Sequence, residues 1–172
     1  MQSRLGDAGN RLGKGHGTGV GIMGGLTGDL NGMVLPVDDL DNENMAYFSY
    51  CAKGDFRLQK CLENGLLRYP PTTRCPFSGH AEAEWVSVEG KGTVFTYNAV
   101  HHAIQPAFKG IVPYMLLLVE LDSQTGKPTE HDGLRVAGNL VTSDGEFAPP
   151  ELIKRVGIGS RMKMVFKPVG DG

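Results

Sequence analysis

Residues 90–120, GKGTVFTYNAVHHAIQPAFKGIVPYMLLLVE, decide the fold of this chain. The first part is rich in Thr, Val, Phe and Tyr, which suit the pleated surface of a β-sheet. In such a strand Val94 and Thr96 are expected on one face and Phe95 on the other. A loop with two prolines follows, and residues 114–121 are almost unbroken apolar, which predicts a second strand covered on both faces. This apolar run is far shorter than the roughly 20 residues of a membrane span.

Length and composition favour one ordinary globular domain, or a small domain with an appendage. The chain has 172 residues, of which 40% are hydrophobic, so it can bury one core. Its formal net charge of -2 argues against a nucleic-acid-binding protein, which usually carries a basic face. Three cysteines do not make a secreted disulfide framework, and no signal peptide or apolar span is present. We therefore expect a soluble cytoplasmic protein that does not associate with membranes.

Residues 1–40 are expected to form a glycine-rich flexible tail and connector, because so much glycine makes folding costly in chain entropy. Gly19, Gly21 and Gly24 match the GxGxxG pattern of nucleotide sites. The match is weak, because no strand precedes it and no clear helix follows. A tail that becomes ordered against a partner is the alternative to a flexible one.

Residues 41–83 are predicted to form a helix, a hairpin and a further turn. Asp41 or Asn42 caps a helix that runs to about Lys53, and Gly54 ends it. Residues 56–71 form a hairpin around Glu63-Asn64-Gly65, because Asn-Gly is a strong hairpin signal.

Residues 84–172 are predicted to form a barrel. The expected strands are 84–88, the two strands of the central stretch, 134–141 and 161–168, with a short helix near 150–156. Four or five strands with one small helix before the last strand fit a small, partly open Greek-key barrel of the OB type. The fold class is therefore mainly β.

Cys61 and Cys75 each begin a turn, as cysteines of a zinc ribbon do. A zinc ribbon has C-x-x-C at both turns, so that four thiolates bind one zinc ion. Here the second positions are Asn64 and Ser78, which are poor zinc ligands. His80 would supply at most a third ligand. The pattern favours a ribbon that has lost its metal, with no firmly bound cofactor.

A series of short motifs runs through residues 43–172 in a fixed order. They are LQKC at 58–61, PP at 70–71, RCP at 74–76, Trp85, GKGTV at 90–94, YNAVHH at 97–102, PAF at 106–108, VPY at 112–114, VEL at 119–121, GNLV at 138–141 and GIGSR at 157–161. The series resembles the acyl-CoA-associated family that joins an N-terminal rubredoxin-like zinc ribbon to a C-terminal OB-fold. The incomplete C-x-x-C pairs depart from the family pattern.

The resemblance implies a non-catalytic accessory subunit. Members of this family pair with thiolase-superfamily enzymes, which include thiolases, acyltransferases and sterol-carrier-protein-type aldolases; some pair with hot-dog-fold enoyl-CoA hydratases. The OB domain would help to form the acyl-CoA site of such a complex, while the ribbon and helix dock on the partner. Acyl-CoA would be the substrate of the complex, and the nucleophile and base would belong to the partner.

Candidate contact residues follow from this expectation. In the central loop they are His101, His102, Pro106, Phe108 and Tyr114, for substrate or partner. On the helix, exposed Tyr47, Phe48 and Tyr50 are expected interface anchors, because aromatic residues are enriched at interfaces. Purely structural alternatives remain. The loop would then only pack on the barrel, and the two histidines would have a structural role, with one side chain pointing inward and one outward.

Three further features have weaker interpretations. Phe147 and the following Ala-Pro-Pro run are typical of a partner-facing loop. Lys109, Arg155, Arg161 and Lys163 are either CoA-phosphate contacts or a solvated basic face. Rival functions are an OB-fold that binds single-stranded nucleic acid, and a free-standing enzyme that uses His101 or His102.

Overall fold

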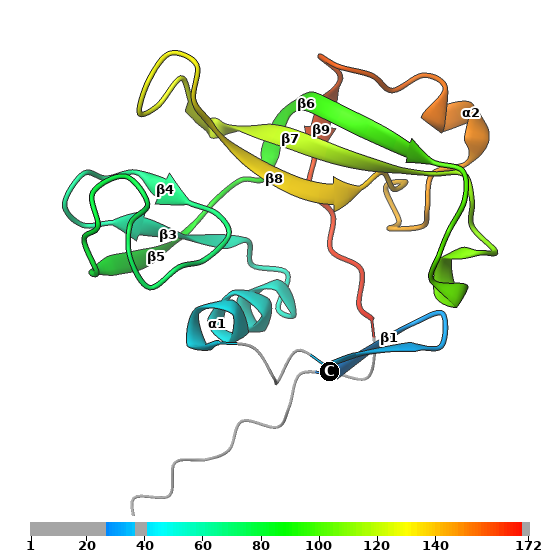
Figure 1. Cartoon of the computed structure of the whole chain (residues 1–172), viewed down its shortest axis with the longest axis horizontal. Coiled ribbons are helices and arrows are strands. Elements are labelled where there is room, and N and C mark those ends of the chain that lie inside the picture. The colour runs from blue at the N-terminus through cyan, green and yellow to red at the C-terminus, as the bar shows by residue number, and fades with distance from the viewer. Residues whose placement is uncertain (1–26, 37–40, 170–172) are drawn as a thin grey trace, which may run out of the picture.

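The computed structural model describes residues 27–36 and 41–169. This part of the chain is mainly β, with three antiparallel sheets joined by short helices and turns (Figure 1). Two-, three- and four-stranded sheets follow one another along the sequence. Within the described residues, the helices are too short or too polar to cross a membrane.

The first sheet is a hairpin of β1 (Thr27–Leu30) and β2 (Met33–Pro36). Its turn residues Asn31 and Gly32 have positive φ angles of 52° and 81°, which a two-residue hairpin turn needs and Asn-Gly supplies at low cost. The sequence analysis assigned this stretch to a flexible tail and connector, so the hairpin differs from that expectation. The remainder of the assignment, residues 1–26 and 37–40 with the GxGxxG match, lies outside the described residues.

Helix α1 (Asn42–Cys51) begins where the Asp41 side chain accepts the backbone N–H of Asn44 at 2.8 Å. After it, Gly54 has a φ of 68°, a left-handed conformation that favours glycine. The predicted helix is confirmed, although it ends at Cys51 and not near Lys53.

The second sheet contains β3 (Arg57–Cys61), β4 (Leu67–Arg68) and β5 (Ala83–Ser87) in the order β4-β3-β5. The predicted hairpin is confirmed, because β3 pairs with β4 across the turn that contains Gly65. β5 pairs with β3 along its whole length. The sequence-based division placed this strand with the OB domain, whereas its hydrogen bonds place it in the ribbon sheet.

The third sheet has the order β8-β7-β6-β9 and curls into a half-barrel (Figure 1). Its strands are β6 (Lys91–Val100), β7 (Tyr114–Thr125), β8 (Gly133–Asn139) and β9 (Arg161–Lys163). The 3₁₀-helix η1 (Pro106–Phe108) lies between β6 and β7, and helix α2 (Pro150–Ile153) lies before β9. A helix and ribbon followed by a small OB-type barrel is the predicted fold class, which is therefore confirmed.

A β-bulge at Phe95 divides β6. Val94 is opposite Val119, but Thr96 is opposite Leu118, so the register shifts by one residue. Adjacent residues of β7 point to opposite faces, and Val94 and Thr96 therefore do so as well. The prediction that these two residues share a face is wrong. The bulge increases the local twist, which helps the sheet to curl.

Strand β7 has one covered face and one open face. Met115, Leu117 and Leu121 are 2%, 6% and 1% exposed, whereas Leu116 is 41% exposed. The prediction of a strand covered on both faces is therefore wrong. An antiparallel sheet can leave one face open, and an apolar run alone does not distinguish the two cases.

Two clusters of buried side chains hold the molecule together. The first joins α1, the ribbon sheet and the half-barrel through Tyr47, Phe56, Leu58, Leu121 and Val136. The second lies between α2 and the sheet and contains Val94, Met115, Leu117, Leu140, Ala148 and Ile153. Because the first cluster contains residues of both sheets, the ribbon and the half-barrel pack against each other.

Candidate functional site

The connection between β6 and β7, which we call the β6–β7 loop (residues 101–113), leaves the half-barrel on the side of the hairpin β1–β2 (Figure 1). The side-chain amide of Asn31, in the hairpin turn, donates to the carbonyl oxygen of Ala107 at 3.0 Å. Pro106 starts η1, where its fixed φ suits the first helical position. The hairpin β1–β2, which the sequence analysis did not predict, therefore contacts this loop through a hydrogen bond.

Three aromatic rings fix this loop to the rest of the molecule. The ring centroids of Phe108 and Tyr114 are 5.2 Å apart, and Phe147 lies 6.1 Å and 6.0 Å from them. Such tilted and edge-on pairs add to the stabilisation from burial. The structure thus brings together two of the predicted contact residues and adds Phe147, which the sequence placed on a partner-facing loop.

The β6–β7 loop presents several side chains to solvent. His101, His102 and Pro106 are exposed, and Ile104 is 87% exposed, whereas Ala103 is buried. The prediction that one histidine points inward is wrong, because β6 ends at Val100 and the alternation of a strand stops there. Sequence reasoning missed Ile104, because nothing in this mixed polar and apolar stretch marks which apolar side chain is exposed.

The two histidines have no orienting carboxylate in the part of the chain that the structure describes. The histidines that lie near carboxylates there are His80, beside Glu82, and His131, beside Glu130. A histidine that acts as a general base is usually held by a third group. In the described residues, His101 and His102 therefore do not form a catalytic dyad with a carboxylate.

The aromatic residues of helix α1 are less exposed than predicted. Tyr47 is 8% exposed and contacts Phe56 and Tyr69, and burial raises the pKa of its hydroxyl. It belongs to the core and cannot be an exposed anchor. Tyr50 is partly buried against Trp85 with Arg57 over its ring, and only Phe48, at 38% exposure, is open to solvent.

The four positions of the zinc-ribbon pattern do meet in space. The Cys61 sulfur lies 3.8 Å from the Ser78 hydroxyl, and the Asn64 amide donates to the Cys75 sulfur at 3.6 Å. Both turns have the same backbone bond, from Gly65 N–H to the Cys61 carbonyl and from Gly79 N–H to the Cys75 carbonyl.

This cluster lacks the ligands that zinc requires. In the described residues no three His, Cys, Asp or Glu side chains are grouped so that they could hold a metal ion, and the His80 ring faces Glu82. Burial raises the pKa of Cys75, but hydrogen bonds from the backbone of Phe77, the Ser78 hydroxyl and the Asn64 amide outweigh burial and lower it to about 6. These donors partly replace a metal as stabilisers of a thiolate.

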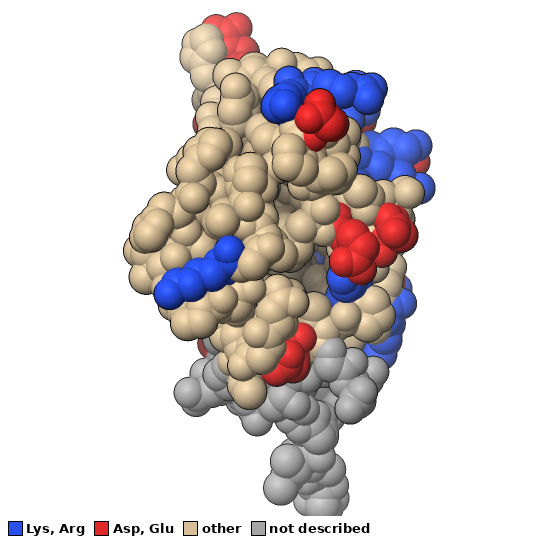
Figure 2. All heavy atoms as spheres, turned by 90° about the vertical axis from the view of Figure 1, so that its right-hand side faces the viewer, with Lys and Arg blue, Asp and Glu red and all other residues tan. Residues whose placement is uncertain are grey.

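Of the four basic residues proposed for CoA phosphates, one is paired with a carboxylate and the other three are exposed. The Arg161 guanidinium binds both carboxylate oxygens of Asp122, at 2.7 and 2.5 Å, and its hydrogen bonds lower the pKa of that carboxyl. Lys109, Arg155 and Lys163 are exposed. Figure 2 shows the side of the molecule that bears the β6–β7 loop as a mostly uncharged surface with separate charges, which does not favour a nucleic-acid groove.

Comparison with known proteins gives one family. The model of the ChsH2 C-terminal OB-fold domain matches residues 85–167. A probable enoyl-CoA hydratase alpha subunit of Thermomonospora curvata is 31% identical over 121 residues; the match covers 68% of this chain and 37% of that protein. A DUF35 domain-containing scaffold protein of Methanocaldococcus jannaschii is 28% identical over 123 residues, which cover 71% of this chain and 72% of that protein.

The solved structure of the Ltp2-ChsH2(DUF35) aldolase contains a chain with a similar fold. It is 27% identical, with a TM-score of 0.57, and the alignment covers 76% of this chain and 90% of that one. The present chain thus spans most of the matched chain in the aldolase structure but only about a third of the hydratase subunit. Through residues 85–167, this chain belongs to the DUF35/ChsH2 C-terminal OB-fold family.

Proposed function

We propose that this chain is a non-catalytic scaffold subunit that assembles with a thiolase-superfamily enzyme acting on acyl-CoA, with an aldolase as the first candidate partner. The observation that carries the proposal is the similarity to a chain of the Ltp2-ChsH2(DUF35) aldolase over 90% of that chain. The relative from Methanocaldococcus jannaschii, a scaffold protein by name, supports the same role.

The β6–β7 loop is the contact surface that fits this role best. The rings of Phe108, Tyr114 and Phe147 pack together at one part of it, and Ile104 in the same loop is 87% exposed. A loop that is already ordered loses little conformational entropy on docking. A single exposed apolar side chain on such a loop can fill a pocket of the partner, as interface hot spots do.

The chemistry of the complex would reside in the partner. His101 and His102 have no carboxylate beside them in the described residues, so nothing on this surface sets up a nucleophile or base. We assign them, with Pro106, to contacts with the partner or with acyl-CoA at the edge of its site. A second candidate partner is a hot-dog-fold enoyl-CoA hydratase, which the relative named as a hydratase alpha subunit favours.

Co-expression with each candidate partner tests the proposal. The full chain is produced with a thiolase-superfamily aldolase, or with a hydratase chain, from the same genome, and the mass of each purified complex is measured by light scattering. A stable hetero-oligomer with the aldolase supports the proposal, and one with the hydratase alone moves it to the second candidate. A chain that remains alone with both partners contradicts it.

A further inference from the structure

Cys61 and Cys75 occupy the same place in two turns of the ribbon that have the same backbone hydrogen bonds. The N–H of Cys61 donates to the Leu66 carbonyl at 2.9 Å, and the N–H of Cys75 donates to the His80 carbonyl at 2.8 Å. In each turn the glycine four residues after the cysteine donates back to the cysteine carbonyl. The two cysteine side chains therefore leave the backbone from equivalent positions in two matching turns.

Each turn also places a polar side chain on the sulfur of the other turn. Asn64, in the first turn, donates its amide to the Cys75 sulfur at 3.6 Å. Ser78, in the second turn, has its hydroxyl oxygen 3.8 Å from the Cys61 sulfur and also hydrogen-bonds to the Cys75 sulfur. One hydroxyl thus contacts both sulfur atoms. The two thiols face each other across one small polar cluster, as two cysteines that form a disulfide must.

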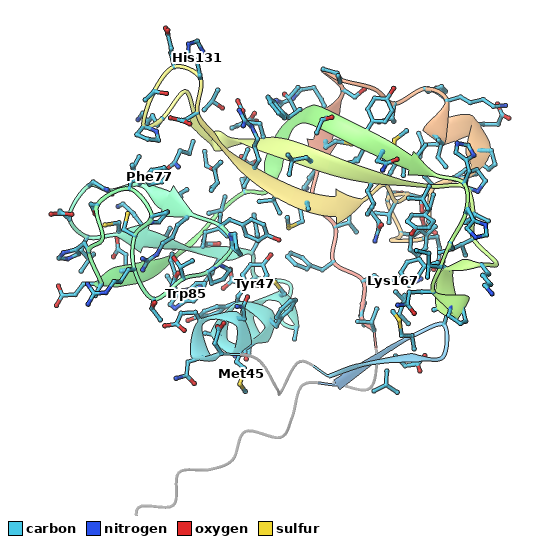
Figure 3. All side chains as sticks on the ribbon, viewed as in Figure 1. Met45, Tyr47, Phe77, Trp85, His131 and Lys167 are labelled. Atoms are coloured by element: carbon cyan, nitrogen blue, oxygen red, sulfur yellow. The ribbon has the colours of Figure 1, made fainter. Side chains whose placement is uncertain are left out.

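The third cysteine lies outside this cluster. Cys51 is on helix α1, and its thiol hydrogen-bonds to the hydroxyl of Tyr47, one helical turn earlier. In Figure 3, Phe77, two residues after Cys75, lies on the ribbon turns and away from Tyr47. All three cysteines are free thiols. Cys51 is therefore a control within the same chain for the other two.

Only a thin layer separates the two sulfurs from solvent. Cys61 and Cys75 are 1% and 2% exposed, but Asn64 and Ser78, whose side chains contact the sulfurs, are themselves exposed. Local opening of such a turn costs much less free energy than unfolding of the core. A small reagent can then reach the thiols, and the amide and hydroxyl donors favour the thiolate that attacks a disulfide.

We propose that Cys61 and Cys75 form a reversible disulfide by exchange with a small-molecule disulfide, and that this bond joins the two ribbon turns. The Cys75 thiolate attacks one sulfur of the reagent, the S–S bond of the reagent breaks, and one small thiolate leaves. The Cys61 thiolate then attacks the Cys75 sulfur of the mixed disulfide and displaces the second small thiolate.

The exchange balances without a further oxidant. The two protein thiols are oxidised, the reagent is reduced to two thiols, and the two protons pass from the cysteines to the leaving thiolates. The bond forms within this chain, so the proposal does not depend on the scaffold role or on any partner. Because a disulfide restricts the unfolded chain, the oxidised protein should be the more stable form.

The test is incubation of the folded full chain at pH 8 with oxidised glutathione and a chelator, followed by alkylation of the remaining thiols and mass analysis. We expect alkylation of Cys51 alone, where the untreated chain has three free thiols, and a peptide link between Cys61 and Cys75. The Tm should rise by about 5 °C or more, and dithiothreitol should reverse the rise.

Two variants separate the steps. Cys51→Ser should form the same link, because its thiol takes no part. In Cys61→Ser the reaction should stop at the mixed disulfide, with glutathione held on Cys75. Thermal unfolding confirms that each variant is folded, and Cys61→Ala serves if Cys61→Ser is not. Peptide mapping of the unsubstituted chain needs no variant at all.

Several outcomes would overturn the inference. They are three alkylated cysteines after treatment, a link that includes Cys51 or a second chain, or glutathione that stays on Cys75 although Cys61 is present. A link between Cys61 and Cys75 that forms only in denaturant would also overturn it, because the folded turns would then not bring the two sulfurs together.

Discussion

Asn64 donates its side-chain amide to the sulfur of Cys75 at 3.6 Å, at a position where a zinc ribbon has a second cysteine on the metal. Cys61 and Ser78 face each other in the same way at 3.8 Å. The two turns have therefore kept the geometry of a metal site while replacing half of its ligands with polar side chains.

Restoring the two cysteines should restore a metal site. In the double variant Asn64→Cys/Ser78→Cys four thiolates would converge, and we expect about one zinc ion per chain by elemental analysis, with a higher Tm that a chelator reverses. The control is Thr73→Cys/Ser143→Cys, which adds two exposed cysteines elsewhere. Zinc in the control at the same level, or none in the double variant, would show that the four positions do not form a site.

The thiolate of Cys75 should make stability depend on pH. Its pKa is about 6 in the folded chain, below the roughly 8.5 of a free cysteine. A lowered pKa stabilises the fold fully above the unfolded pKa, and the effect disappears as the pH falls through about 6. The decrease in Tm caused by Cys75→Ala should therefore be larger at pH 9 than at pH 5.5.

Cys51 is the matched comparison, because burial raises the pKa of its thiol. A raised pKa has the opposite sign: its contribution is present below the unfolded pKa and is lost as the pH rises. The decrease in Tm caused by Cys51→Ala should not grow between pH 5.5 and pH 9. Equal pH profiles for the two variants would contradict the assigned pKa of Cys75.

Replacing Arg68 with an apolar residue should stabilise the protein. It is 2% exposed, and in the described part of the molecule its Nε and Nη1 atoms are buried without a hydrogen-bond partner. A buried cation without partners destabilises a fold, and replacing it with an apolar side chain of similar length removes that cost. Denaturant unfolding of Arg68→Met should show a gain of about 1–3 kcal/mol.

The exposed Arg155 provides the control for Arg68. Arg155→Met should change the free energy of unfolding by no more than about 0.5 kcal/mol, as most surface substitutions do. A loss of stability in Arg68→Met would show that the guanidinium has a favourable environment in solution.

The exposed Ile104 of the β6–β7 loop should control assembly. Ile104→Asp places a charge where an apolar contact with the partner is proposed, so the Kd of the complex should rise at least about tenfold with little change in Tm. Ile158→Asp is the control, because Ile158 is also exposed, at 72%, but lies in the turn between α2 and β9. Equal weakening by both variants, or by neither, would remove the loop from the interface.

Local patterns in the sequence were sufficient to predict most of the secondary structure. The cap at Asp41, the turn at Asn64-Gly65 and the alternation around Tyr97 each depend on a few neighbouring residues. The bulge at Phe95 was not predictable, because an extra residue in one strand is visible only against the partner strand. The hairpin at residues 27–36 was hidden by the glycines around it, although Asn31-Gly32 was a usable signal.

The candidate site was less accessible to sequence reasoning than the fold. Spacing identified the β6–β7 loop, but exposure depends on tertiary packing, so Ile104 was missed and Tyr47 was placed on the surface. A cavity beneath the half-barrel is formed by segments far apart in the sequence, such as α1 and residues 164–169. No local pattern encodes such a space.

The central claim, that this chain is a scaffold whose partner performs the chemistry, is tested most directly by reconstitution. Retro-aldol turnover of an acyl-CoA is measured with this chain alone, with the thiolase-superfamily partner alone and with the two mixed. We predict no turnover by this chain alone and more turnover by the mixture than by the partner alone. Turnover by this chain alone, or no more turnover by the mixture than by the partner alone, would contradict the account.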